Sequence, residues 1–344
     1  MIQDIRSLIQ TAAARRLDSR LNVFQIEVKT LTTSTLTLTG RVLEAADLQE
    51  LTGALAARFP SLKIETSGVQ VLRRPENPIL TVCVNLTSLH REPDWLSEQC
   101  SQLLYGTRLE VLEERGRWVF VRQTDGYLGW AYRLYLSTQA APEPDHILCE
   151  PLSPLRAEPD LNASLTGRLL IGTRLRVTRR QGDFAWIEAH PEQTTTSLSG
   201  GWILASHLRP LASLPQTLEV RQHSLLADAF RMLGTMYLWG GSSAYGIDCS
   251  GLAQLCHRLS GITIPRDADM QMAAGRPVEY PYRPGDLVFF GEDGNSWPVT
   301  HVAISLGGWK IIHSTRARDG VYTDDIQAVA HLRSSFLGGV TYLD

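Results

Sequence analysis

An internal repeat in the middle of the chain restricts its fold more than any other feature of the sequence. Three motifs occur twice in the same order, at one offset except for a short insertion around positions 193–198 in the second copy. They are Glu92-Pro-Asp94 with Glu158-Pro-Asp160, Gly106-Thr-Arg-Leu109 with Gly172-Thr-Arg-Leu175, and Gly129-Trp130 with Gly201-Trp202. Short strands separated by glycine turns are typical of small β-barrels. The repeat therefore predicts two barrels, at residues 78–138 and 145–210.

The segment before the repeat has the pattern of a small α+β domain. Its first apolar residues share one face of a helix, and they are Ile5, Leu8, Ile9 and Ala12. Further patterns predict strands at 23–30, 35–42 and 62–72 and a helix at 45–59. We therefore expect a packing or interaction module at residues 1–75. A further α+β domain is predicted at 216–344.

Composition narrows the class of protein. The 344 residues include 43% apolar and 20% charged residues, which is ordinary for a globular chain of two to four domains. A net charge of -3 gives no electrostatic case for nucleic acid or an anionic membrane as a partner. The first residues lack a basic segment followed by an apolar run, so we expect no signal peptide and a cytoplasmic location.

The five cysteines include no CxxC pair, which makes a disulfide framework or a zinc site improbable. We expect neither a metal nor an organic cofactor.

Cys249 is the first candidate for chemistry. It follows Tyr237-Leu-Trp-Gly-Gly241 and lies within Gly246-Ile-Asp-Cys-Ser-Gly251, where glycines favour tight turns. Apolar residues at helical spacing begin directly after it, so Cys249 is predicted in the first turn of a helix that ends near Ser260. The partial positive charge of a helix N-terminus favours a thiolate, which predicts a depressed pKa for Cys249. Cys256, two turns later, should be buried and inert. The alternative for Cys249 itself is a small buried residue at the start of a core helix.

Two histidines supply partners for this cysteine. His301 lies in the apolar strand predicted at 299–306, and His313 ends the strand predicted at 309–313 after the Gly307-Gly308 turn. Antiparallel pairing of these strands would place the two imidazoles close together. A cysteine, a base and a group that orients the base form the set required for covalent acyl transfer.

Residues 220–344 resemble the NlpC/P60 papain-like cysteine peptidases. The resemblance rests on Tyr237-Leu-Trp-Gly-Gly241, Asp248-Cys-Ser-Gly251, Pro265-Arg-Asp267 with Gln271, Pro284-Gly-Asp-Leu-Val-Phe-Phe290, His301-Val-Ala-Ile304 and Ile312-His313. It implies that Cys249 is the nucleophile, His301 the base and His313 its orienter, while Tyr237 assists the oxyanion. The repeat is similar to bacterial SH3-like domains, and residues 1–75 weakly resemble a BON-type domain. The expected architecture is thus a multidomain α+β chain.

The resemblance also implies a substrate. Relatives with this layout cleave γ-D-glutamyl bonds to a diamino acid in murein peptides with a free N-terminal L-Ala, as in murein-peptide recycling. Carried over, Glu98 and Asp267 would bind the terminal ammonium and Arg266 the D-glutamyl carboxylate. Glu98 and Tyr127 are unshared between the two repeats, which favours a role specific to the first barrel. The other expected substrate contacts are Trp239, Asp248 and Ser250.

Two other functions remain compatible with the sequence. The barrels could be the functional part of a wall-binding protein with a degenerate peptidase domain. Alternatively, the same chemistry could serve an amidase or an acyltransferase of the same superfamily.

Overall fold

The computed structural model of the chain describes residues 1–16, 18–192, 197–291 and 299–343. It separates into two compact units. Unit 1 combines Met1–Ile79 with Leu109–Trp130, and unit 2 combines Leu80–Arg108 with Ala131–Asp344. Residues 193–196, which belong to the insertion expected in the second repeat, lie outside the described residues. None of the helices in the described ranges is both long and apolar enough to cross a membrane.

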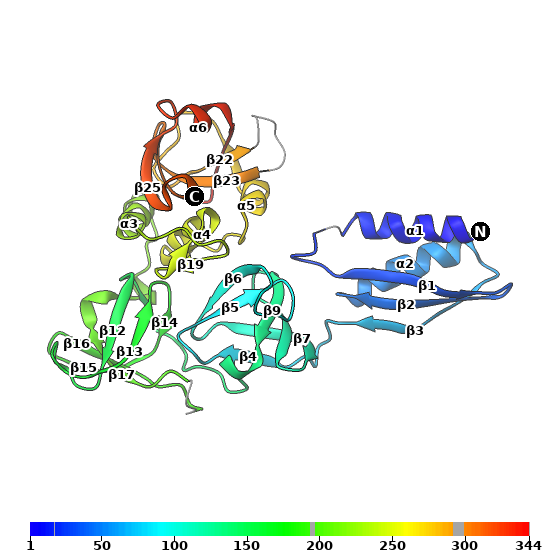
Figure 1. Cartoon of the computed structure of the whole chain (residues 1–344), viewed down its shortest axis with the longest axis horizontal. Coiled ribbons are helices and arrows are strands. Elements are labelled where there is room, and N and C mark those ends of the chain that lie inside the picture. Colours follow the sequence, from blue (N-terminus) through cyan, green and yellow to red (C-terminus); the bar gives the residue numbers. More distant parts are fainter. Residues whose placement is uncertain (17, 193–196, 292–298, 344) are drawn as a thin grey trace. The chain divides into compact units, whose positions relative to one another are not determined.

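The N-terminal part of unit 1 has the predicted helix-strand-strand-helix-strand order. Its elements are α1 (Ile2–Ala14), β1 (Phe24–Leu31), β2 (Thr35–Val42), α2 (Ala45–Arg58) and β3 (Lys63–Val71). Strand β2 is central, antiparallel to β1 and parallel to β3. Both helices cover the same face of this sheet (Figure 1). Ile5 from α1, Leu38 from β2 and Leu55 from α2 are buried between them, as their spacing predicts.

The first barrel contributes strands to both units. Its elements are β4 (Ile79–Val82), β5 (Leu86–His90), β6 (Gln99–Leu104), β7 (Arg108–Arg115), β8 (Trp118–Arg122), β9 (Leu128–Tyr132), η1 (Arg133–Tyr135) and β10 (Leu136–Ser137). In unit 1, β7 pairs with β8. In unit 2, β5 pairs with β6 and β4 pairs with β10. All three pairings are antiparallel.

The second barrel repeats this plan in unit 2. Its elements are β11 (His146–Leu148), β12 (Leu152–Arg156), β13 (Leu165–Leu170), β14 (Arg174–Leu175), β15 (Val177–Gln181), β16 (Phe184–Ile187), β17 (Gly201–Leu204), η2 (Ala205–His207) and β18 (Leu208–Pro210). They form a five-stranded sheet, β13-β12-β17-β16-β15, and a three-stranded one, β14-β11-β18. The repeated glycines share a backbone conformation, with φ of 79° at Gly106 and 84° at Gly172. The backbone therefore makes the same turn at the equivalent glycine of each copy.

The C-terminal domain places helices against a six-stranded sheet. Its elements are η3 (Leu211–Ser213), α3 (Leu218–Arg231), β19 (Ser242–Ser243), β20 (Gly246–Ile247), α4 (Cys249–Leu259), α5 (Ala268–Ala274), β21 (Arg276–Val278), β22 (Leu287–Gly291), β23 (Val299–Gly307), β24 (Lys310–Thr315), η5 (Arg316–Arg318), β25 (Gly320–Asp325), α6 (Ala330–Ser334) and β26 (Phe336–Thr341). The strand order is β21-β26-β22-β23-β24-β25. The expected α+β architecture of this domain is confirmed.

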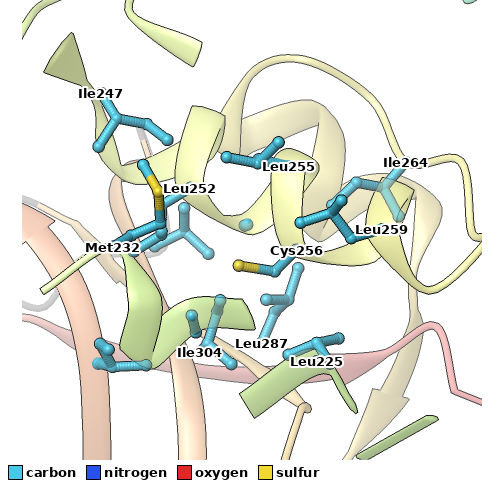
Figure 2. Close-up of a cluster of buried hydrophobic side chains, with 14 of the residues drawn as sticks. Leu225, Met232, Ile247, Leu252, Leu255, Cys256, Leu259, Ile264, Leu287 and Ile304 are labelled. Carbon is cyan, nitrogen blue, oxygen red and sulfur yellow. The ribbon is translucent and has the colours of Figure 1, made fainter. Parts of the chain in front are cut away.

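Helix α4 lies in the centre of this domain's core. Figure 2 shows its apolar side chains, among them Leu252 and Cys256, surrounded by residues of α3 and the sheet. Ile147 and Ile171 of the second barrel belong to the same buried cluster. The barrel is also attached by Arg209, whose Nη1 donates to Asp228 Oδ2 at 3.0 Å. The second barrel and the helix that carries Cys249 thus share one core.

Candidate active site

Cys249 is the first residue of α4, where the sequence predicted it. Asp248 caps the helix, since its Oδ1 accepts from the Gly251 N–H at 2.6 Å and its Oδ2 from the Gly240 N–H at 2.9 Å. Gly240 has a φ of 71°, and a Cβ there would lie 2.3 Å from the Gln99 carbonyl oxygen. Only glycine fits between the cap and strand β6. Cys249 is therefore held on a tight turn and is partly buried against the core.

The two predicted histidines meet across neighbouring strands. Strands β23 and β24 pair antiparallel, and the distance from His301 Nε2 to His313 Nδ1 is 2.7 Å. Their expected juxtaposition is confirmed. His313 Nε2 lies 2.9 Å from Asp324 Oδ2 on the adjacent strand β25. A continuous hydrogen-bonded chain thus runs from His301 through His313 to Asp324.

No motif of the sequence pointed to Asp324. Asp319-Gly320 is a turn signal, and Asp319 has a left-handed φ of 51°. A strand read from that turn pairs with β24, placing Tyr322 opposite His313. Asp324 is two residues further, on the same face of β25. The turn was therefore the signal that would have located it.

The nucleophile borders the first of these histidines. The Val302 backbone, next to His301, makes a hydrogen bond that favours the Cys249 thiolate. Because Nε2 of His301 is occupied by His313, Nδ1 is the ring nitrogen left for the proton of Cys249. The set can therefore perform nucleophilic acyl transfer.

The predicted depressed pKa of Cys249 is wrong. Burial, followed by the charge of Asp248, raises the pKa of the thiol to about 12. Burial, followed by the charges of His313 and His331, lowers the pKa of His301 to about 3. Desolvation disfavours both charged forms and outweighs the helix N-terminus. The resting pair is thus a neutral thiol beside a neutral imidazole.

Tyr237 is suited to donate a hydrogen bond. Burial first, and then charge on Cys249 and Asp248, raises the pKa of its phenol to about 12, although the Arg316 guanidinium acts in the opposite direction. The phenol therefore keeps its proton at neutral pH. Its proximity to Cys249 is consistent with the expected role in holding an oxyanion.

Arg266 occupies a different role from the one expected. It is 2% exposed, and its guanidinium makes five hydrogen bonds. The acceptors are Ser101 Oγ, Asp248 Oδ1 and Oδ2, Ser250 Oγ and the Gly241 carbonyl. They engage all five N–H groups of the side chain. Arg266 thus holds Asp248 and Ser250 in place, instead of presenting donors to a substrate carboxylate.

An acidic region from the first barrel adjoins this site within unit 2. Glu98 Oε1 accepts from Trp239 Nε1 at 2.9 Å. Both Glu98 and Asp267 are close enough to Cys100 for their charges to raise its pKa, which burial brings to about 11. Glu98 therefore lies beside Trp239, and both expected ammonium ligands lie near Cys100. Tyr127 is buried in unit 1, and its part in substrate binding stays a prediction.

Comparison with known proteins agrees with this geometry. The NlpC/P60 family model matches residues 234–336, and a model described as bacterial dipeptidyl-peptidase Sh3 domain matches residues 89–131. Two relatives carry the name gamma-D-glutamyl-L-lysine dipeptidyl-peptidase. The one from Bacillus cereus is 28% identical over 64% of this chain and 68% of the relative. The one from Bacillus subtilis is 27% identical over 63% and 72%.

A crystal structure shares the fold. It is that of an NlpC/P60 family protein from Bacillus cereus, with a TM-score of 0.66 and 22% identity, covering 77% of this chain and 100% of that one. The domain matches coincide with the segments that hold Cys249, His301 and Glu98. The chain therefore carries an NlpC/P60 cysteine peptidase domain together with a bacterial SH3 domain.

Proposed function

We propose that this peptidase hydrolyses the γ-D-glutamyl bond to a diamino acid in murein-derived peptides with a free N-terminal L-Ala. The observation that carries the proposal is Glu98, which accepts from Trp239 Nε1 at 2.9 Å, two residues after the proposed oxyanion donor Tyr237. The charge of Asp267 acts on the same buried Cys100 as that of Glu98. The names of the two Bacillus relatives support the same bond class. A cytoplasmic location stays a prediction, which fractionation of the producing cells tests. A role in murein-peptide recycling also stays a prediction.

The hydrogen-bonded chain sets the tautomers that this reaction requires. A carboxylate accepts only, so Asp324 holds the proton of His313 on Nε2 and leaves Nδ1 as an acceptor. His301 then carries its proton on Nε2, which donates to His313 Nδ1. The unprotonated Nδ1 of His301 is left as the base for Cys249. The hydrogen bonds thus orient His301, His313 and Asp324 while Cys249 and His301 are both neutral in the resting enzyme.

The reaction follows from that arrangement. His301 Nδ1 takes the thiol proton while Sγ of Cys249 attacks the γ-carbonyl carbon, and Tyr237 donates to the resulting oxyanion. Removing one such donor typically costs about 3 kcal/mol of transition-state stabilisation. His301 next gives the proton to the leaving amine, which departs as the C–N bond breaks and leaves a thioester. Water attacks the thioester, His301 accepts its proton, and the acid is released as Cys249 regains its hydrogen.

The acidic pair explains a requirement for a free amino terminus. A terminal ammonium can pair with Glu98 and Asp267, whereas an acylated amine carries no charge with which they can pair. We expect acetylation of L-Ala-γ-D-Glu-L-Lys to lower kcat/KM by about 30-fold or more, since losing a charged pair costs about 2–5 kcal/mol.

The matched variant is Glu98→Gln, which keeps an oxygen acceptor for Trp239 Nε1 but removes the charge. It should lower kcat/KM for the free peptide and narrow the gap to the acetylated one. Equal kcat/KM for the two peptides in the unmodified enzyme would contradict the proposed terminus requirement.

A further inference from the structure

Arg316 is an exposed cation that lies over the rings of Tyr237 and Trp239. It begins η5, directly after the strand that carries His313. Its guanidinium carbon lies 5.4 Å from the ring centroid of Tyr237 and 5.0 Å from that of Trp239. Both distances are within the range of cation–π attraction. Tyr237 and Trp239 thus hold Arg316 in place.

Among the described residues Arg316 has no acidic partner, in contrast to its neighbour Arg318. Arg318 Nη1 lies 3.2 Å from Asp324 Oδ1. Within the described part of the chain, no carboxylate is in salt-bridge contact with Arg316. The Arg316 guanidinium also makes a hydrogen bond with the Tyr237 hydroxyl, which acts to lower the pKa of that phenol. Attraction to the ring faces leaves its other N–H groups unused, and a guanidinium edge can match a carboxylate in two parallel hydrogen bonds. Arg316 is therefore disposed to bind an anion from outside the chain.

The proposed substrate supplies such an anion. A γ-D-glutamyl peptide has a free α-carboxylate on D-Glu, and the leaving diamino acid has a carboxylate of its own. Arg266, the residue first expected to bind the D-Glu group, uses all five N–H groups within the protein. In the proposed function, Glu98 and Asp267 bind the ammonium end of the peptide. A cation for the carboxylate must come from elsewhere.

We propose that Arg316 binds a substrate carboxylate next to the scissile bond and so selects peptides with a free acid at that position. This assignment rests on the proposed function. It makes Arg316 a specificity-determining residue that acts through direct contact with the peptide. Amidated peptides, in which that carboxylate is a carboxamide, would be poor ligands.

The test measures binding separately from turnover. Isothermal titration calorimetry on the full-length Cys249→Ala protein uses L-Ala-γ-D-Glu-L-Lys and two matched amides. One amide replaces the D-Glu α-carboxylate and the other replaces the lysine carboxylate. We expect one of them to bind about 10- to 100-fold more weakly than the free acid, as for a lost charge-assisted hydrogen bond. The identity of that amide shows which carboxylate Arg316 contacts.

Two substitutions in the same background decide the assignment. Arg316→Gln should abolish the preference for the free acid. Arg179→Gln is the matched control, because Arg179 is also exposed and lies over two rings, 4.5 Å from Trp186 and 5.5 Å from Trp202, in the second barrel. It should leave the preference intact. An unchanged preference in Arg316→Gln, or equal binding of all three ligands before it is introduced, overturns the assignment.

Turnover of the free acid by the unmodified enzyme is assayed in parallel. If the peptide is not cleaved but the Arg316-dependent preference is present, the proposed reaction is refuted while the Arg316 assignment stands. If the peptide is cleaved and the preference is absent, the proposed reaction stands and the Arg316 assignment is refuted.

Discussion

His301 Nε2 and His313 Nδ1 are 2.7 Å apart, so one of the two nitrogens must carry the shared proton and the other must accept it. Asp324 decides which, because its Oδ2 lies 2.9 Å from the far nitrogen of His313. The Asp324 carboxylate, two side chains away from Cys249, thus determines which nitrogen of His301 is free to act as the base. The carboxylate is a positioning residue, since it acts on Cys249 only through both imidazoles.

The first prediction concerns Asp324→Asn. An asparagine amide can donate to His313 Nε2 and so favour the opposite tautomer, which would leave Nδ1 of His301 protonated. We expect kcat to fall roughly 10- to 100-fold, with little change in KM. Steady-state kinetics across pH should also show an altered acid limb, because Asp324 raises the pKa of His313 against the effect of burial.

Asp325→Asn is the matched control for that variant. Asp325 lies on the same strand, and its Oδ1 accepts from the backbone N–H of Gln327. It should retain wild-type kcat and the wild-type pH profile. An Asp324→Asn enzyme with the same profile as this control would remove Asp324 from the mechanism.

A second prediction concerns thiol reactivity. With a pKa near 12, Cys249 has little thiolate at neutral pH, so alkylation by iodoacetamide should be slower than for a free cysteine. The rate should rise about tenfold per pH unit up to pH 9. Peptide mapping should still find Cys249 modified first, because the other four cysteines are buried. Rapid labelling at pH 6 would instead indicate a thiolate in the resting enzyme.

A third prediction concerns the buried pair Arg266 and Asp248. Their Nη2 to Oδ2 distance is 2.7 Å, and the two side chains are 1% and 9% exposed. Arg266→Ala would leave Asp248 charged and unpaired, lowering the free energy of unfolding of the peptidase domain by about 3–5 kcal/mol. Urea denaturation measures this change.

Adding Asp248→Asn to Arg266→Ala should recover part of the loss, because the unpaired charge is removed. Arg333→Ala, at an exposed position of the same domain, should change the stability by less than about 0.5 kcal/mol. A similar small effect for Arg266→Ala would show that the buried ion pair is not a structural requirement.

A fourth prediction concerns stability at acid pH. Burial lowers the pKa of His257 to about 4, and its Nδ1 donates to the Ala253 carbonyl oxygen at 2.8 Å. Between about pH 6.5 and pH 4 the unfolded chain therefore binds a proton that the folded chain does not, so stability falls as pH is lowered through that window. His257→Leu should make the dependence of the unfolding free energy on pH shallower. An unchanged slope would contradict the assignment.

The sequence predicted the parts of this site that depend on local pattern. Glycines and apolar spacing located Cys249 at the start of α4, and strand alternation with a glycine turn placed His301 beside His313. The repeat similarly predicted the two barrels, because each copy needs the same turn at Gly106 and Gly172. These features are set by backbone conformation within a few residues of the motif.

The remaining features depend on contacts between distant segments. Arg266 is buried and donates to Ser101, which is 165 residues away in the chain. The motif around Arg266 therefore could not show that all its N–H groups have acceptors within the protein. The pKa of Cys249 depends on desolvation by the packed domain, which a helix N-terminus could not reveal. Arg316 follows no recognised motif, and its position over Tyr237 and Trp239 arises only from tertiary packing.

Mass spectrometry of the products of L-Ala-γ-D-Glu-L-Lys shows whether Cys249 cleaves the γ-D-glutamyl bond. The unmodified enzyme should release L-Ala-γ-D-Glu and free lysine, while Cys249→Ala, at equal concentration and with wild-type thermal stability, should release neither. Cleavage at the L-Ala–D-Glu bond would refute the proposed bond specificity, and undiminished release of lysine by Cys249→Ala would remove Cys249 as the nucleophile.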